Sequence, residues 1–267
     1  MENPDYAVGT AKNRLKIEYF GLSCFVITSS NGTKIITDPF FAGQRVLHTM
    51  LRKEPADVVT VSCGSYAHCH VFDVGGSPYA YQITEPTELA GILFRGVATR
   101  HLEMLEVSTT KPGDNVVMCF EVDGIKLCHL GALGHKLTDE QAKQIGKVDI
   151  LMVPVGGVST LPVEDAKEVC RQLNPQIILP MHYRSERCDF QGWAGVEEFF
   201  KDRPSVEKVY FGVKRKYYEN VLRSDLEIGS SQLEFQMRNG KVVLTSRGAN
   251  DQITAETLNI IVPRFVY

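Results

Sequence analysis

The hydrophobic pattern of the chain centres on one apolar run that leads into a polar loop rich in cysteine and histidine. Residues 58–61 read Val-Val-Thr-Val, a short β-branched run typical of strands that are covered on both faces of a sheet. The loop that follows places two thiols and two imidazoles within eight positions, at Cys63, His68, Cys69 and His70. Loops at strand ends carry much of the chemistry of α/β proteins, so we expect the functional site here.

Other apolar segments predict a series of short strands. Asn31-Gly32, Asp123-Gly124 and Asn239-Gly240 indicate hairpin turns, because these residue types accept positive φ. Strands are expected at residues 15–18, 24–28, 33–37, 58–61, 79–83, 91–99, 115–122, 125–130, 149–154, 176–179, 209–214, 233–245 and 258–262. The strand at 176–179 is expected to stop at Pro180, because proline cannot donate to a central ladder.

Helical periodicity appears mainly in the second half of the chain. Thr138 and Gln141 form a capping-box pattern at the start of residues 138–145. Apolar residues recur at helical spacing along 162–173, and 195–200 predicts a further short helix. The order is hairpins first, then strands alternating with helices, then strands again, which predicts a mixed α/β layered domain.

Composition excludes some classes of function. A formal net charge of −3 over 267 residues gives no reason to expect nucleic acid as a partner. The longest apolar runs are too short to span a membrane, and the first residues lack the basic and apolar regions of a signal peptide, so we expect a cytoplasmic protein. Seven cysteines in a chain this long, without a CxxC pair, indicate reduced thiols.

Several segments together resemble one known family. They are residues 19–25 (Tyr-Phe-Gly-Leu-Ser-Cys-Phe), 37–40 (Thr-Asp-Pro-Phe), 129–135 (His-Leu-Gly-Ala-Leu-Gly-His), 153–157 (Val-Pro-Val-Gly-Gly) and 180–183 (Pro-Met-His-Tyr). Their order and spacing are similar to those of metallo-β-lactamase-fold metal-dependent hydrolases, closest to the ascorbate-phosphate lactonase branch. The resemblance implies a four-layered αββα sandwich. We expect one domain over residues 1–267, with an extended β-rich segment at about 204–267.

The same resemblance implies where metal ligands should lie. The family binds two metal ions, usually zinc, through a His-x-His-x-Asp-His loop, a later histidine, a bridging aspartate and a final histidine. In this chain the four loop positions fall on Cys63, Ser65, Ala67 and His68. The later histidine falls on His101, the bridging aspartate on Ala132 and the final histidine on His182. Leu22 also stands where the family has a histidine.

These replacements predict that the two-zinc centre does not form. Two dications about 3.5 Å apart repel by roughly 19 kcal/mol at an effective dielectric near 20, and carboxylates normally offset this repulsion. Ala67 and Ala132 supply no charge. The expectation is therefore no metal, or a single zinc or other divalent ion. Such an ion would use His68, His101 and His182, with Cys63 as a weak further candidate.

Each candidate also has a structural interpretation. Cys63 is read first as a small buried residue and second as a ligand. The resemblance makes His129, His135 and Tyr183 pocket neighbours together with Ser65, Ala67 and Ala132, although hydrogen-bonded structural histidines are common. Arg100 and Arg184 lie beside the retained histidines and could meet an anionic ligand.

Three functions remain open. The first is a hydrolase-family protein with an eroded site, weakly active or non-catalytic, that binds an unidentified small molecule. The second is a mononuclear metal-dependent hydrolase built on the three histidines. The third is a binding or assembly protein, such as a homo-oligomer, that uses the old pocket or the hairpin at 233–245.

Overall fold

The computed structural model describes residues 14–41, 54–82, 84–102, 115–185, 188, 190–201, 209–210, 232–245, 253–254 and 261–262. Residues 42–53 and most of the segment 204–267, with much of the strands expected at 209–214 and 258–262, lie outside the described residues. No helix within the described ranges is long and apolar enough to cross a membrane.

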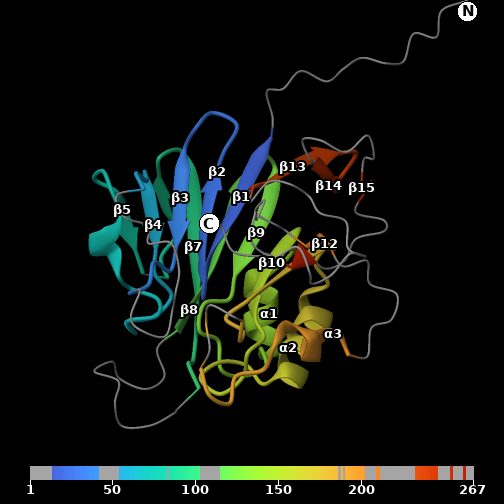
Figure 1. Ribbon diagram of the computed structural model, residues 1–267. Helices are drawn as coiled ribbons and strands as arrows, with labels where there is room; N and C mark the ends of the chain where they lie inside the picture. The colour runs from blue at the N-terminus through green and yellow to red at the C-terminus, as the bar shows by residue number, and fades with distance from the viewer. Residues whose placement is uncertain are drawn as a thin grey trace, which may run out of the picture.

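Two β-sheets face each other and form the centre of the molecule (Figure 1). The first has eight strands in the order β15-β14-β13-β1-β2-β3-β4-β5. In chain order these are β1 (Leu15–Gly21), β2 (Cys24–Thr28), β3 (Lys34–Thr37), β4 (Val58–Thr60), β5 (Tyr79–Tyr81), β13 (Gln232–Arg238), β14 (Lys241–Thr245) and β15 (Ile253–Thr254). A 3₁₀ turn, η1 (Val71–Asp73), lies between β4 and β5.

The second sheet has six strands in the order β11-β10-β9-β8-β7-β6. They are β6 (Thr87–Leu89), β7 (Ile92–Thr99), β8 (Asn115–Val122), β9 (Ile125–His129), β10 (Ile150–Pro154) and β11 (Ile177–Met181). The helices α1 (Asp139–Ile145), α2 (Val163–Leu173) and α3 (Val196–Phe200) lie beside this sheet (Figure 1). The short strands β12 (Val209–Tyr210) and β16 (Ile261–Val262) pair with each other.

Local sequence signals explain most of these elements. The capping box at Thr138 and Gln141 is present, with each side chain bonded to the other residue's backbone N–H. Asp123-Gly124 and Asn239-Gly240 both have positive φ and close the hairpins β8–β9 and β13–β14. The run at residues 58–61 forms β4, whose three residues are all buried and which pairs in parallel with β3 and β5. Burial on both faces matches its β-branched composition.

The prediction that Pro180 ends its strand was wrong. β11 continues through Pro180 to Met181, and Pro180 lies opposite Val153 in the parallel ladder with β10. β11 is the edge strand of its sheet, so a residue without an N–H leaves no central hydrogen bond unmade. This extension places His182 directly at the end of the strand.

The C-terminal hairpin completes the first sheet. β13 pairs with β1, with Ile17 opposite Leu233, and β14 pairs with β15 on its other side. Phe235 on β13 is fully buried, and Arg14 donates to the buried carboxylate of Glu234 at 2.8 Å. Both edges of this hairpin are therefore used within the chain.

We expect Phe235→Ala to lower the free energy of unfolding by about 3–5 kcal/mol, because it leaves a cavity between the sheets. Gln236→Ala is the matched control on the neighbouring, less buried position and should cost less than about 1 kcal/mol. Urea unfolding followed by circular dichroism measures both. Equal costs would show that the hairpin does not contribute to the core.

Candidate functional site

The carboxylate of Asp38 is the centre of a buried polar cluster. β3 ends at Thr37, and the backbone N–H of Asp38 donates to the carbonyl of Thr60 at 2.8 Å, which ties the end of β3 to the end of β4. Asp38 is fully buried and has φ +39°, a conformation that aspartate tolerates better than most residues. Ser62 donates to its two oxygens, from the backbone N at 2.7 Å and from Oγ at 2.5 Å.

His68 is the third donor to this carboxylate. Its Nδ1 lies 2.7 Å from Asp38 Oδ2, and its side chain is 1% exposed. Because an ionised carboxylate oxygen can only accept, Nδ1 is the donor in this hydrogen bond, and Nε2 is the nitrogen of the ring that this contact leaves unused. This is the arrangement in which a carboxylate orients a histidine for ligand binding.

His129 lies beside the cluster but is held as a neutral structural residue. Its Nε2 donates to the carbonyl of Ser23 at 2.8 Å, and its Nδ1 accepts from the N–H of Gly131 at 3.2 Å. The 4.0 Å approach of Nδ1 to Asp38 is therefore no ion pair. Burial lowers the pKa of His129, against the opposing charge of Asp38.

His182 lies in a stack of rings. Its ring centroid is 5.3 Å from that of His68 and 4.2 Å from that of Trp193, and Trp193 in turn stacks on Phe190. Its Nδ1 is buried and has no hydrogen-bond partner in the described part of the chain. Burial places the pKa of His182 well below the usual value, and the nearby His68 and His101 lower it further. His182 therefore presents an uncharged imidazole.

The backbone around His182 is held in an unusual conformation. His182 has φ +54°, and its N–H donates at 2.7 Å to the carbonyl of Leu22, which itself has φ +48°. A side chain at Gly156 would place its Cβ 2.2 Å from the His182 carbonyl oxygen, so only glycine allows this close approach. Leu22, at the position where the resemblance implied a histidine, thus contributes its carbonyl group to the site.

His101 approaches the same region from the second sheet. It forms an isolated β-bridge with Leu133, and its Nδ1 donates to the Leu102 carbonyl at 2.8 Å. Its pKa is lowered by partial burial and then by His68. The three histidines singled out from the sequence therefore influence one another electrostatically.

The remaining sequence candidates contribute little donor chemistry. Burial, and then the charge of Asp38, raise the pKa of Cys63 to about 12, so its thiol stays protonated at neutral pH. Ala132 is fully buried, and its N–H donates at 2.8 Å to Asn115, which also bonds Thr99 and Leu130. Ser65 and Ala67 lie in the turn before His68.

The neighbouring residues named from the resemblance have structural contacts. His135 accepts from the N–H of Arg100 at 3.1 Å and donates to the carbonyl of Lys136. Tyr183 is buried and stacks on Tyr19 at 6.3 Å. Arg184 forms a β-bridge with Gly195 through its backbone. In the described ranges, no group of three or more His, Cys, Asp or Glu side chains is arranged to hold a metal ion.

Sequence reasoning missed the central role of Asp38 and the ring stack of Trp193. In the sequence, Asp38 directly follows the strand expected at residues 33–37 and belongs to the segment Thr37 to Phe40 that carries the resemblance, and neither position indicated its role. Trp193 is the sole tryptophan of the chain, which was a signal that could have been followed.

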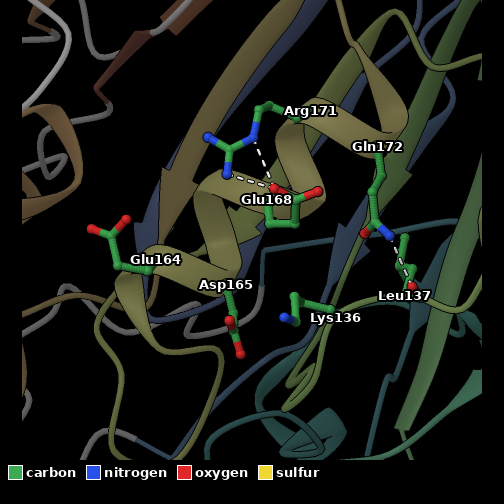
Figure 2. A pocket seen from close by; sticks show the side chains of 7 residues that line it. All are labelled: Lys136, Leu137, Glu164, Asp165, Glu168, Arg171 and Gln172. Atoms are coloured by element: carbon green, nitrogen blue, oxygen red, sulfur yellow. Dashed lines mark hydrogen bonds and ion pairs between the residues drawn. The ribbon is translucent and has the colours of Figure 1, made fainter.

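A surface cavity of about 460 Å³ lies elsewhere, along α2 (Figure 2). It is lined by Lys136, Leu137, Glu164, Asp165, Glu168, Arg171 and Gln172. Arg171 donates to Glu168 on its own helix, and Gln172 donates to the Leu137 carbonyl at 2.9 Å. Arg171 and Glu168 pair with each other, and none of the clustered histidines lines the cavity. We therefore place the candidate site at the histidines.

Comparison with known proteins identifies the family and the fold. The family model described as "Beta-lactamase superfamily domain" matches residues 16–182, which run from β1 to the ring stack. The chain belongs to this superfamily. The expectation of a metallo-β-lactamase fold is confirmed by a crystal structure from Thermotoga maritima. That metallo-β-lactamase superfamily protein is 30% identical, with a TM-score of 0.62, over 93% of this chain and 97% of the other.

Curated relatives are named as UPF0173 metal-dependent hydrolases. The protein from Methanosphaera stadtmanae is 26% identical over 201 residues, 64% of this chain and 85% of its own length. The protein from Thermoplasma acidophilum is 25% identical over 219 residues, 73% of this chain and 97% of its own length. The matches thus cover most of each relative.

Asp38→Asn is expected to destabilise the protein by roughly 3 kcal/mol, because it weakens hydrogen bonds from Ser62 and His68 to a buried charge. Asp73→Asn is the matched control, since Asp73 pairs with His70 at the surface and should matter by about 0.5 kcal/mol or less. Denaturant unfolding measures the difference. Equal losses would contradict a central role for Asp38.

Stability should also fall as the pH drops below about 6.5. The folded-state pKa values of His129 and His182 lie below the ordinary 6.5, so the unfolded chain binds protons that the folded chain does not. Each histidine contributes at most about 1.4 kcal/mol per pH unit over this window. His129→Gln, which can still donate to Ser23, should make the fall shallower. An unchanged slope in unfolding experiments from pH 7 to 5 would refute this account.

Proposed function

We propose that this metallo-β-lactamase-fold protein has an eroded dinuclear site and is weakly active or acts by binding a small molecule in the old pocket. One observation carries the proposal. At the two positions where the resemblance places carboxylate ligands, the chain has Ala67 and Ala132, and the described residues hold no three side chains arranged for a metal. On this proposal the chain keeps the fold of a metal-dependent hydrolase family but lacks carboxylates at the two positions where the resemblance places them.

The remaining donors do not fit two metal ions. The Asp38 carboxylate already accepts from Ser62 and His68, so it orients a histidine and does not bridge metals. The Cys63 thiol, with a pKa of about 12, is not a thiolate at neutral pH. Repulsion between two dications would therefore meet no offsetting negative charge in the positions that the family uses.

A mononuclear metal-dependent hydrolase is the second candidate. His68 and His101 each use Nδ1 in a hydrogen bond and leave Nε2 for a ligand, and His182 has an unpartnered Nδ1. All three rings could therefore supply a neutral nitrogen, the form that zinc binds. The rings would have to rearrange to converge on one ion, because the described side chains are not arranged to hold one.

The similarity of the sequence motifs to the ascorbate-phosphate lactonase branch suggests a substrate class. A phosphorylated sugar lactone is the compound with which residual hydrolysis should be sought. The partly buried ring of Phe190, which stacks on Trp193, offers an apolar surface for the ring of such a ligand.

Metal stoichiometry tests the proposal. The chain is purified from zinc-supplemented cells and analysed by mass spectrometry of metals, and the apoprotein is then titrated with zinc by calorimetry. Trp193 reports the pocket directly, because it stacks on His182 at 4.2 Å and is the sole tryptophan. We expect fewer than two zinc ions per chain. None supports the eroded site, one supports the mononuclear candidate, and two would overturn both.

Substitutions separate the two candidates further. If one ion binds, His182→Ala should abolish it and the accompanying change in Trp193 fluorescence, whereas the surface control His70→Ala should retain both. Restoring carboxylates with Ala67→Asp and Ala132→Asp should raise the zinc content above that of the unaltered chain. No increase in a folded double variant would indicate that erosion of these two positions is not what limits metal binding.

A further inference from the structure

Two cysteines face each other on the β8–β9 hairpin. Cys119 of β8 lies directly opposite Cys128 of β9, and their Sγ atoms are 3.9 Å apart. All seven cysteines of the chain are free thiols, and this is the pair for which the structure shows a sulfur–sulfur contact among the described residues.

The hairpin geometry places this pair where a disulfide fits. The two-residue turn Asp123-Gly124 makes Val122 and Ile125 a hydrogen-bonded pair, and such pairs alternate with non-hydrogen-bonded ones along an antiparallel ladder. Three steps from that pair, Cys119 and Cys128 are a non-hydrogen-bonded pair. Their Cα atoms are then about 4.5 Å apart, which lies inside the range of about 4.4–6.8 Å found for disulfides.

The pair also lies at the border between the surface and the core. On the same face of the sheet, the next pair towards the turn is Glu121 and Lys126, which are both exposed, whereas Cys119 is 5% exposed and Cys128 is fully buried. On the other side of Cys119 lies Arg95 of β7, an exposed residue whose guanidinium donates to the Gln144 carbonyl on α1. Cys119 is therefore the less deeply buried of the two thiols, and exposed side chains lie beside it.

We propose that Cys119 and Cys128 are a redox-active dithiol that hydrogen peroxide converts into a cross-strand disulfide. The Cys119 thiolate attacks one peroxide oxygen, the O–O bond breaks, and the leaving hydroxide takes a proton to become water. The resulting sulfenic acid is attacked by Cys128 sulfur, the S–S bond forms, and the S–O bond breaks with loss of a second water. Two thiols and one peroxide thus give one disulfide and two waters.

The electrostatics favours Cys119 as the sulfur that reacts first. The hydrogen bond with Cys128 lowers the pKa of Cys119, against the effect of burial, and the Arg95 guanidinium lowers it further. Burial raises the pKa of Cys128 well above its usual value, so this thiol keeps its proton until it attacks the sulfenic acid. The thiolate is the nucleophilic form of cysteine, which gives the pair an order of reaction.

Oxidation at this position has a direct route to the histidine site. A disulfide shortens the sulfur–sulfur distance from 3.9 Å to about 2.05 Å, at the residue just before His129 on β9. His129 is fixed at 2.8 Å to the Ser23 carbonyl and lies 4.0 Å from Asp38. The dithiol therefore connects the redox state of the cell with the position of a site residue.

Peptide mapping of the full chain tests the proposal. The protein is treated with hydrogen peroxide, remaining thiols are blocked with an alkylating reagent, and tryptic peptides are analysed without reductant. Trypsin cleaves after Lys126 and so separates the two cysteines, and a disulfide would join the Cys119 peptide to the Cys128 peptide. We expect this cross-link, with loss of two hydrogens, and its reversal by dithiothreitol.

Cysteine substitutions test whether the cross-link is specific to this pair. Cys119→Ser and Cys128→Ser should each abolish the cross-link, while Cys170→Ser, a buried cysteine on α2, should leave it unchanged. In Cys128→Ser a dimedone-type reagent should trap the sulfenic acid at Cys119. Two results with the peroxide-treated, unaltered protein would overturn the proposal, whether or not the variants fold. In the first, Cys119 and Cys128 are both recovered fully alkylated. In the second, they are cross-linked to other cysteines.

Discussion

A buried negative charge organises this structure. The Asp38 carboxylate has no access to water, so its stability in the fold depends on donors that other segments bring to it. Ser62 and His68 arrive from the loop after β4, and the backbone of Asp38 itself is tied to Thr60. Because a buried charge without partners is costly, the end of β3 and the loop after β4 must keep their relative positions. The loop that first suggested metal chemistry is thus held by a carboxylate outside it.

Two buried imidazoles near this charge, those of His129 and His182, have lowered pKa values. His129 has both ring nitrogens in hydrogen bonds, and His182 is uncharged because burial disfavours its protonated form. Neutral imidazoles are the right form for a metal ligand, but they add no charge that could offset a dication. On the proposal that the carboxylate ligands are lost, such an environment would offer a pair of metal ions no compensating charge.

Local signals predicted the elements well, and long-range contacts were the part that the sequence could not supply. The capping box at Thr138 and the turn at Asn239-Gly240 depend on neighbouring residues alone, so their patterns were sufficient. Pro180 was misjudged because proline is excluded from central strands only, and the edge position of β11 depends on the arrangement of the whole sheet. The role of Asp38 was hidden for a similar reason, since its partner His68 lies thirty residues away. Whether the histidines converge on one ion depends on ring orientations that no residue pattern encodes.

Three residues at the site, Leu22, Asp38 and His182, have left-handed backbone conformations. Each such conformation stores of order 1–3 kcal/mol in a residue other than glycine, and packing elsewhere in the fold must hold it in place. The candidate site therefore stores conformational energy in a chain whose net stability is expected to be only about 5–15 kcal/mol. Substitutions that relaxed these three positions would release this energy, and would also change the backbone that orients the rings of the site.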